Sequence, residues 1–175
     1  MDIRYKLVTQ DYKTMKGTSK EMDWSDCAWK EATGFSSKLC SSGVIHSYES
    51  LEIALFMNPS HANIVKPRLL EVECENLLAK DGTKAGYKRM RKIREICSFK
   101  EPTITQRIAF GILCALQVYT EPGFCLWAKA WLLGKNRGWK AASDAAYAAY
   151  AADAAAITVI KDFSLINIAS KAMKY

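Results

Sequence analysis

Cys40 and His46 are the residues whose types and spacing could carry chemistry within one short stretch. They lie in the segment Leu-Cys-Ser-Ser-Gly-Val-Ile-His at residues 39–46. A cysteine becomes a nucleophile when a neighbouring cation or a helix N-terminus stabilises its thiolate. Imidazole titrates near neutral pH, so His46 could act as a general base. A buried structural cysteine and a structural histidine are the alternatives, and the same holds for the second histidine, His61.

A run of basic residues is the strongest electrostatic feature of the chain, whose formal net charge is +7. As a functional patch it would contact phosphates or an acidic protein surface, with steep salt dependence. Alternatively, it is one face of a strand or helix whose charge is partly neutralised across a sheet. The basic residues are Lys84, Lys88, Arg89, Arg91, Lys92 and Arg94, and the acidic residues of the alternative are Glu71, Glu73, Glu75 and Glu95.

Strands must position most of these residues. Residues 3–9 alternate apolar residues with Arg4 and Lys6, which is typical of a half-buried strand. A short apolar strand should follow the loop at residues 39–43, with Gly43 at a position that requires positive φ. Residues 68–75 give the cleanest alternation, Asp81-Gly82 predicts a turn, and residues 88–99 are then expected to pair with residues 69–75. A helical spacing of residues 90, 93 and 97 keeps a helix open as the alternative for that last segment.

Helices dominate the rest of the expected structure. Ser50 or Ser47 should cap a helix that ends before Pro59. Thr103 and Gln106 have the form of a capping box for a helix over residues 104–119, and Pro122 begins another that Gly134 ends. The alanine-rich stretch is expected to form a helix over residues 139–161, and Asp162 to cap a final one through residue 173.

The predicted fold class is therefore α+β. Residues 1–101 should form an α/β half with three to four strands in a small antiparallel or mixed sheet. Residues 102–175 should form a helical half, a bundle of about four helices, packed with the first half as one compact unit, since no flexible Gly/Ser linker separates them.

Metal, membrane and secretion signals are not evident in the sequence. The six cysteines are scattered singly, without a Cys-x-x-Cys pair, which argues against a zinc site. The N-terminus lacks the apolar segment of a signal peptide, and the uncharged run at residues 108–120 is too short to span a bilayer. We expect a cytoplasmic protein with reduced thiols, no membrane association and no metal.

One resemblance covers most of the chain. The Leu-Cys-Ser-Ser-Gly-x-x-His turn, the Leu-Glu-Val-Glu strand, the Asp-Gly-Thr-Lys turn with a basic strand, and the alanine-rich tail together resemble a family of uncharacterised small bacteriophage proteins. The resemblance implies an accessory factor that acts in the cytoplasm of a bacterial host, many of which inhibit host defence or host nucleic-acid machinery. Its partner would be a host protein or a nucleoprotein complex, and nucleic acid could be contacted through the basic run.

A second resemblance concerns catalysis. Arg4, Ser41-Ser42 and Glu71-Val72-Glu73 are similar in order to the Arg, Ser-Thr-Ser and Glu-x-Glu motifs of ADP-ribosyltransferases, although Ser-Ser-Gly replaces Ser-Thr-Ser here. The resemblance implies that the arginine and serine would hold NAD and the final glutamate would orient its ribose.

The leading expectation is a non-enzymatic interaction protein without a cofactor. The alternatives are an enzyme that uses NAD and a phage structural or assembly component. The sequence leaves the oligomeric state open.

Overall fold

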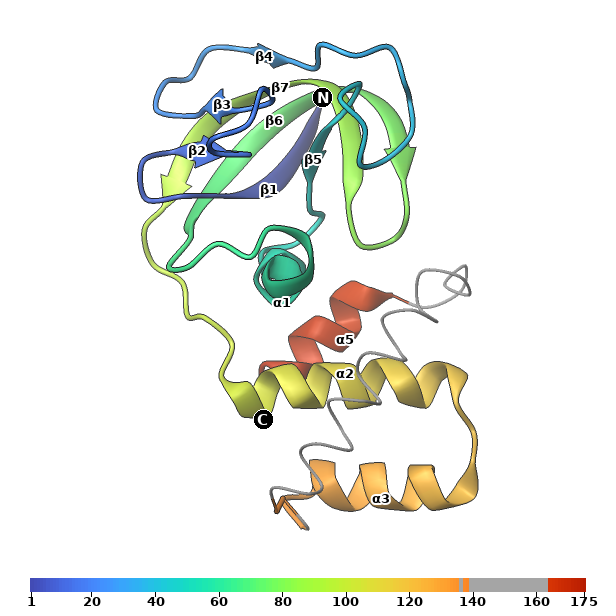
Figure 1. Cartoon of the computed structure of the whole chain (residues 1–175). Helices are drawn as coiled ribbons and strands as arrows, with labels where there is room; N and C mark the ends of the chain where they lie inside the picture. The colour runs from blue at the N-terminus through green and yellow to red at the C-terminus, as the bar shows by residue number, and fades with distance from the viewer. Residues whose placement is uncertain (136, 139–163) are drawn as a thin grey trace. The chain divides into compact units, whose positions relative to one another are not determined.

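The computed structural model describes residues 1–135, 137–138 and 164–175 (Figure 1). The chain divides into two compact units, Met1–Glu101 and Pro102–Tyr175. The alanine-rich helix expected at residues 139–161 and Asp162, the expected cap of the final helix, lie outside the described residues.

Seven strands are described in the first unit. They are β1 (Asp2–Val8), β2 (Lys13–Thr14), β3 (Met22–Asp23), β4 (Lys30–Glu31), β5 (Ile45–Ser47), β6 (Arg68–Lys80) and β7 (Ala85–Ile96). An antiparallel sheet has the order β1-β6-β7-β4, with β5 also paired to β7. The long β6 and β7 form its centre, joined by the predicted Asp81-Gly82 turn, where Gly82 has φ 83°. The strand prediction for residues 88–99 is confirmed, with the strand ending at Ile96.

The two faces of this sheet differ in chemistry. Leu70, Val72 and Cys74 of β6 belong to the hydrophobic core, whereas the alternate Glu71 and Glu73 point to the opposite face, because successive side chains of a strand alternate. On the core face, Trp24 is fully buried, and its indole nitrogen donates a hydrogen bond to Thr14 Oγ1 at 3.0 Å. The chain between β1 and β5 is thus anchored through Trp24, which joins the same core.

Burial along β1 differs from the expected half-buried pattern. Lys6 is only 7% exposed, whereas Ile3 is 47% exposed. Lys6 lies opposite Leu70 in the register and therefore shares the core face of the sheet. The alternation of charged and apolar residues indicated a strand correctly but did not indicate that this lysine is buried.

The helix of the first unit, α1 (Leu51–His61), packs against β1 (Figure 1). Ser50 is its N-cap and accepts a hydrogen bond from Ile53 N at 3.1 Å, as predicted. The predicted end before Pro59 was wrong, because the helix includes Pro59. A proline near the C-terminus of a helix removes only one helical hydrogen bond. After the helix, the Asn58 side chain forms two hydrogen bonds with the backbone of Ile64.

The described part of the second unit is helical. It contains α2 (Ile104–Val118), α3 (Pro122–Leu132) and α5 (Leu165–Ala172), and α2 packs against both of the others. The capping box of Thr103 and Gln106 is present, and Ser164 caps α5. Gln106 also donates a hydrogen bond to the Met173 carbonyl at 2.7 Å, which ties the start of α2 to the end of α5.

The α+β class is confirmed, with an antiparallel sheet in the first half of the chain and helices in the second. The expected three to four strands correspond to β1, β5, β6 and β7. The two-residue strands β2, β3 and β4 are too short to produce a periodic pattern in sequence. None of the described helices is both long and apolar enough to cross a membrane.

Candidate functional site

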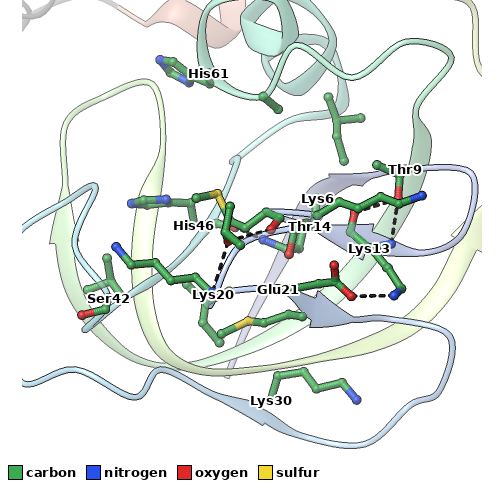
Figure 2. Close-up of a pocket in the computed structure, with 18 of the residues that line it drawn as sticks. Lys6, Thr9, Lys13, Thr14, Lys20, Glu21, Lys30, Ser42, His46 and His61 are labelled. Atoms are coloured by element: carbon green, nitrogen blue, oxygen red, sulfur yellow. Dashed lines mark hydrogen bonds and ion pairs between the residues drawn. The ribbon is translucent and has the colours of Figure 1, made fainter.

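A cleft of about 1100 Å³ opens in the first unit (Figure 2). Its walls come from β1, the β2–β3 hairpin, β4, the loop before β5 and the end of α1. Six lysines and three carboxylates line it. The lysines are Lys6, Lys13, Lys16, Lys20, Lys30 and Lys84, and the carboxylates belong to Glu21, Asp23 and Glu31. Cys40, Ser41, Ser42, His46 and His61 line it as well. The cleft therefore gathers lysines from separate elements together with the residues of the predicted Cys40–His46 loop.

Lys6 is the most deeply buried of these cations. Its ammonium donates a hydrogen bond to the His46 carbonyl at 2.7 Å and lies 4.9 Å from the centroid of the Trp24 ring. Among the described residues no carboxylate forms an ion pair with it. Burial lowers the pKa of Lys6 to about 8, because a charged amine loses its hydration there. Lys6 thus remains mostly protonated at neutral pH as a buried cation, with no counter-ion in the part of the chain that the structure describes.

Cys40 and His46 come together, as the loop sequence suggested. The imidazole Nε2 of His46 accepts a hydrogen bond from the Cys40 backbone N–H at 2.9 Å. The Cys40 side chain is exposed and its Sγ lies 3.4 Å from the ammonium of Lys84. Lys84 belongs to the turn between β6 and β7, so two segments distant in sequence meet at this sulfur.

The loop before β5 is shaped by close backbone contacts. The positive φ expected at Gly43 falls instead on Cys40, with φ 63°. Gly43 is needed for space, because a Cβ atom there would lie 1.9 Å from the Ser36 carbonyl oxygen. Ser41 Oγ donates to the Lys38 carbonyl at 2.6 Å and accepts from Gly43 N at 3.3 Å, which closes the turn that presents Cys40.

His46 is neutral at physiological pH. Burial is the largest cause of its low pKa of about 4, and the positive charges of Lys6 and Lys84 lower it further. Since its Nε2 accepts the hydrogen bond from Cys40, the single proton of the neutral ring resides on Nδ1. The imidazole therefore supports the Cys40 backbone.

The second histidine, His61, lies at the end of α1. Its ring stacks on that of Tyr48 with 6.0 Å between centroids, and Tyr48 Oη lies 3.4 Å from His61 Nδ1. Burial raises the pKa of Tyr48. This pair closes one side of the cleft.

The predicted basic run does not form one surface. Its three arginines pair with glutamates across β6 and β7: Arg89 with Glu75, Arg91 with Glu73, and Arg94 with Glu71, at 3.2, 2.5 and 2.6 Å. Lys88 donates to the Ala32 carbonyl at 2.6 Å, and Lys92 donates to the Ser25 carbonyl. Lys84 alone of this run lines the cleft. These three arginine–glutamate pairs form the arginine ladder of the sheet. Its charge is largely neutralised, as in the alternative interpretation in which glutamates balance the basic run across the sheet.

The residues of the transferase resemblance are not gathered into one site. Arg4 lies opposite Val72, so its side chain shares the core face, and it donates to Ile3 O at 2.9 Å and to Asp2 Oδ2 at 3.4 Å. The side chains of Glu71 and Glu73 extend from the other face of the sheet, where each forms an ion pair with an arginine. Ser41 and Ser42 lie in the cleft.

The remaining charges of the cleft separate into two kinds. Lys13, Lys16 and Lys30 form ion pairs with Glu21, Asp11 and Asp26, at 2.5, 2.7 and 2.7 Å. Lys6, Lys20 and Lys84 form no ion pair in the described part of the chain. The sequence offered no signal for Lys6 or Lys20, because single lysines in a strand and in a polar segment are ordinary and only the folded chain brings them to the same cleft.

No group of three or more histidine, cysteine or acidic side chains suited to a metal ion occurs among the described residues. Comparison with protein-family models, curated proteins and solved structures finds no match to this chain.

Proposed function

We propose that this protein is a non-enzymatic interaction protein of the phage accessory type, which binds the nucleic acid of a bacterial host nucleoprotein complex through the lysine-lined cleft. The observation that carries the proposal is the buried ammonium of Lys6, which has no carboxylate partner among the described residues and lines a cleft rich in further lysines. A buried charge without a partner is costly, so an anionic ligand would supply the missing counter-ion.

The cations of the cleft are compatible with phosphate as the ligand. Arginine binds carboxylates in a two-pronged geometry, and the arginines of β7 already bind glutamates of the same sheet. The cations without ion pairs in the cleft are lysines, whose compact point charges suit the phosphates of a nucleic-acid backbone. A volume of about 1100 Å³ is sufficient for a few nucleotides of a single strand.

Fluorescence anisotropy with a labelled single-stranded oligonucleotide of mixed sequence tests the proposal. We expect binding at low salt by the full chain and a loss of roughly tenfold or more in affinity for the Lys20→Gln, Lys84→Gln double variant. Arg94→Gln is the matched control for each of the two single variants, because it also removes one cation but on the opposite face of the sheet. A duplex of the same sequence should bind more weakly.

Two results would overturn the proposal. Equal competition by polyglutamate and by unlabelled oligonucleotide would indicate an acidic protein as the partner. Undiminished binding by the double variant would remove the cleft from the interface. Affinity capture from bacterial lysate, with and without nuclease, extends the test to the host complex. We expect the protein to capture the complex from untreated lysate and not from lysate treated with nuclease.

A further inference from the structure

Three of the cysteines among the described residues are exposed: Cys27, Cys40 and Cys97. Only Cys40 among them has an ammonium group beside its sulfur, that of Lys84 at 3.4 Å. No hydrogen bond to Cys27 or Cys97 is found in the described part of the chain. Coulomb attraction from an adjacent cation stabilises a thiolate, which is the form that attacks electrophiles. A direct contact with an ammonium thus distinguishes Cys40, whereas Cys97 interacts with the Arg68 guanidinium only electrostatically.

The position of Lys84 is fixed by its turn. Asp81 Oδ1 accepts hydrogen bonds from the backbone N–H groups of Thr83 and Lys84, at 2.9 and 3.0 Å, and from Thr83 Oγ1 at 2.7 Å. That carboxylate oxygen is therefore engaged by its own turn. On the other side, the backbone of Cys40 is held by His46. Hydrogen bonds thus hold the backbones of both residues in the sulfur–ammonium contact.

The buried cation in the same cleft is a second, independent observation. Lys6 is 93% buried, lines the cleft and has no carboxylate partner among the described residues. A reagent that approaches Cys40 through the cleft thus meets Lys6, Lys20 and Lys84, and carries a favourable interaction when it is negatively charged. A neutral reagent lacks this electrostatic attraction.

We propose that Cys40 is a thiol modification site that exchanges with small disulfides bearing carboxylates, the class to which oxidised glutathione belongs. The thiolate of Cys40 attacks one sulfur of the disulfide, and a new S–S bond forms as the old one breaks. The other half leaves as a thiolate, which takes up a proton from solvent. The disulfide is the oxidant, Cys40 is oxidised and the released thiol is the reduced product. The inference does not depend on the nature of the macromolecule that the cleft binds.

Two chromogenic disulfides test it on the full chain: dianionic dithiobis(nitrobenzoate) and neutral dithiodipyridine. We expect one fast thiol with the anionic reagent, lost in Cys40→Ser and retained in Cys27→Ser and Cys97→Ser. Lys84→Gln should slow the reaction of that thiol with the anionic reagent, and slow its reaction with the neutral one by less, because the replacement removes the cation beside the sulfur. Incubation with oxidised glutathione, followed by peptide mass spectrometry of the unaltered chain, should locate the adduct on Cys40.

A first reaction at Cys27 or Cys97 would overturn the proposal. An unchanged rate in Lys84→Gln would overturn the role of the ammonium. Equal preference of Cys40 and the other two exposed cysteines for the anionic reagent would overturn the role of the cleft charge. Because the mass-spectrometric readout uses the unaltered chain, it decides the site even if a variant fails to fold.

Discussion

The ammonium of Lys6 donates a hydrogen bond to the backbone carbonyl of His46 at 2.7 Å, in a position where the lysine is 93% buried. The contact joins β1 to β5 and places a cation inside the wall of the cleft. A single neutral acceptor compensates little of the hydration that a buried ammonium loses. Lys6 is therefore expected to lower the free energy of unfolding while it contributes to binding of an anionic ligand. Such a conflict between stability and binding is common at functional sites.

Replacement of Lys6 by methionine tests this conflict. Methionine has a similar length and no charge, so Lys6→Met should raise the free energy of unfolding at pH 7 by about 1–3 kcal/mol while weakening oligonucleotide binding. In the unaltered chain the unfolded lysine titrates near 10.5 and the folded one near 8, so the unfolded state binds more protons between these values. Stability should consequently rise with pH across this window, and the rise should vanish in Lys6→Met. Urea denaturation at pH 7 and pH 10 measures both effects, and a destabilised variant at pH 7 would contradict the account.

A second pH dependence arises from His46. The unfolded imidazole takes up a proton near pH 6.5, whereas the pKa of the folded one is about 4. The unfolded state therefore binds more protons between these values, and the free energy of unfolding should fall as pH is lowered from 6.5 to 4. His46→Gln retains an oxygen that can accept the Cys40 N–H but does not titrate. The difference in free energy of unfolding between the unaltered chain and His46→Gln should change with pH in this window. A difference that stays constant with pH would argue against a buried neutral His46.

The arginine ladder should matter for stability more than for binding. Glu73 is 7% exposed and accepts from Arg91 Nε at 2.6 Å. Arg91→Met leaves this buried carboxylate without its partner, with an expected loss of about 1–3 kcal/mol. Because the pair lies on the face of the sheet opposite Lys6, oligonucleotide affinity should stay within about twofold once folding is corrected for. Arg94→Met is a milder comparison, since Arg94 is more exposed. A selective loss of binding in Arg91→Met would restore the ladder as an interface.

The helical unit allows a test of its capping box. Thr103 Oγ1 accepts from Gln106 N at 3.2 Å, and Gln106 Oε1 accepts from Thr103 N at 2.9 Å. Thr103→Ala should cost about 1 kcal/mol, whereas Thr103→Ser keeps the hydroxyl and should cost little. Urea unfolding of the full chain, followed by far-ultraviolet circular dichroism, compares the two. Equal losses would indicate that the methyl group, and not the hydroxyl, stabilises the start of α2.

Local patterns were sufficient to predict much of the fold. Alternation predicted β6, the Asp-Gly pair predicted its turn into β7, and the capping residues at Ser50 and Thr103 marked helix starts. Each of these signals lies within a few residues of its effect. The end of α1 was missed because tertiary bonds from Asn58 stabilise a helix end that contains a proline.

The site was less accessible from sequence for the same physical reason. Cys40 and His46 lie in one loop, and their association followed from that proximity. Lys84 reaches Cys40 only through the register of β7 with β5, and Lys6 reaches the wall of the cleft only because the second half of β1 is buried in the fold. The density of positive charge in the basic run favoured a binding patch. Pairing across the sheet then neutralised its arginines, an outcome that depends on a register with bulges between Glu71/Val72 and Leu77/Ala79.

The salt dependence of oligonucleotide binding tests the central claim most directly. Each lysine that neutralises a phosphate of a single strand contributes about 0.7 to the slope of log affinity against log salt concentration. We predict that Lys20→Gln and Lys84→Gln each reduce the slope by about that amount, and the double variant by roughly twice as much, whereas Arg94→Gln leaves it unchanged. An identical slope for the unaltered chain and the double variant would contradict the account, because the lysines of the cleft would then contact no phosphate.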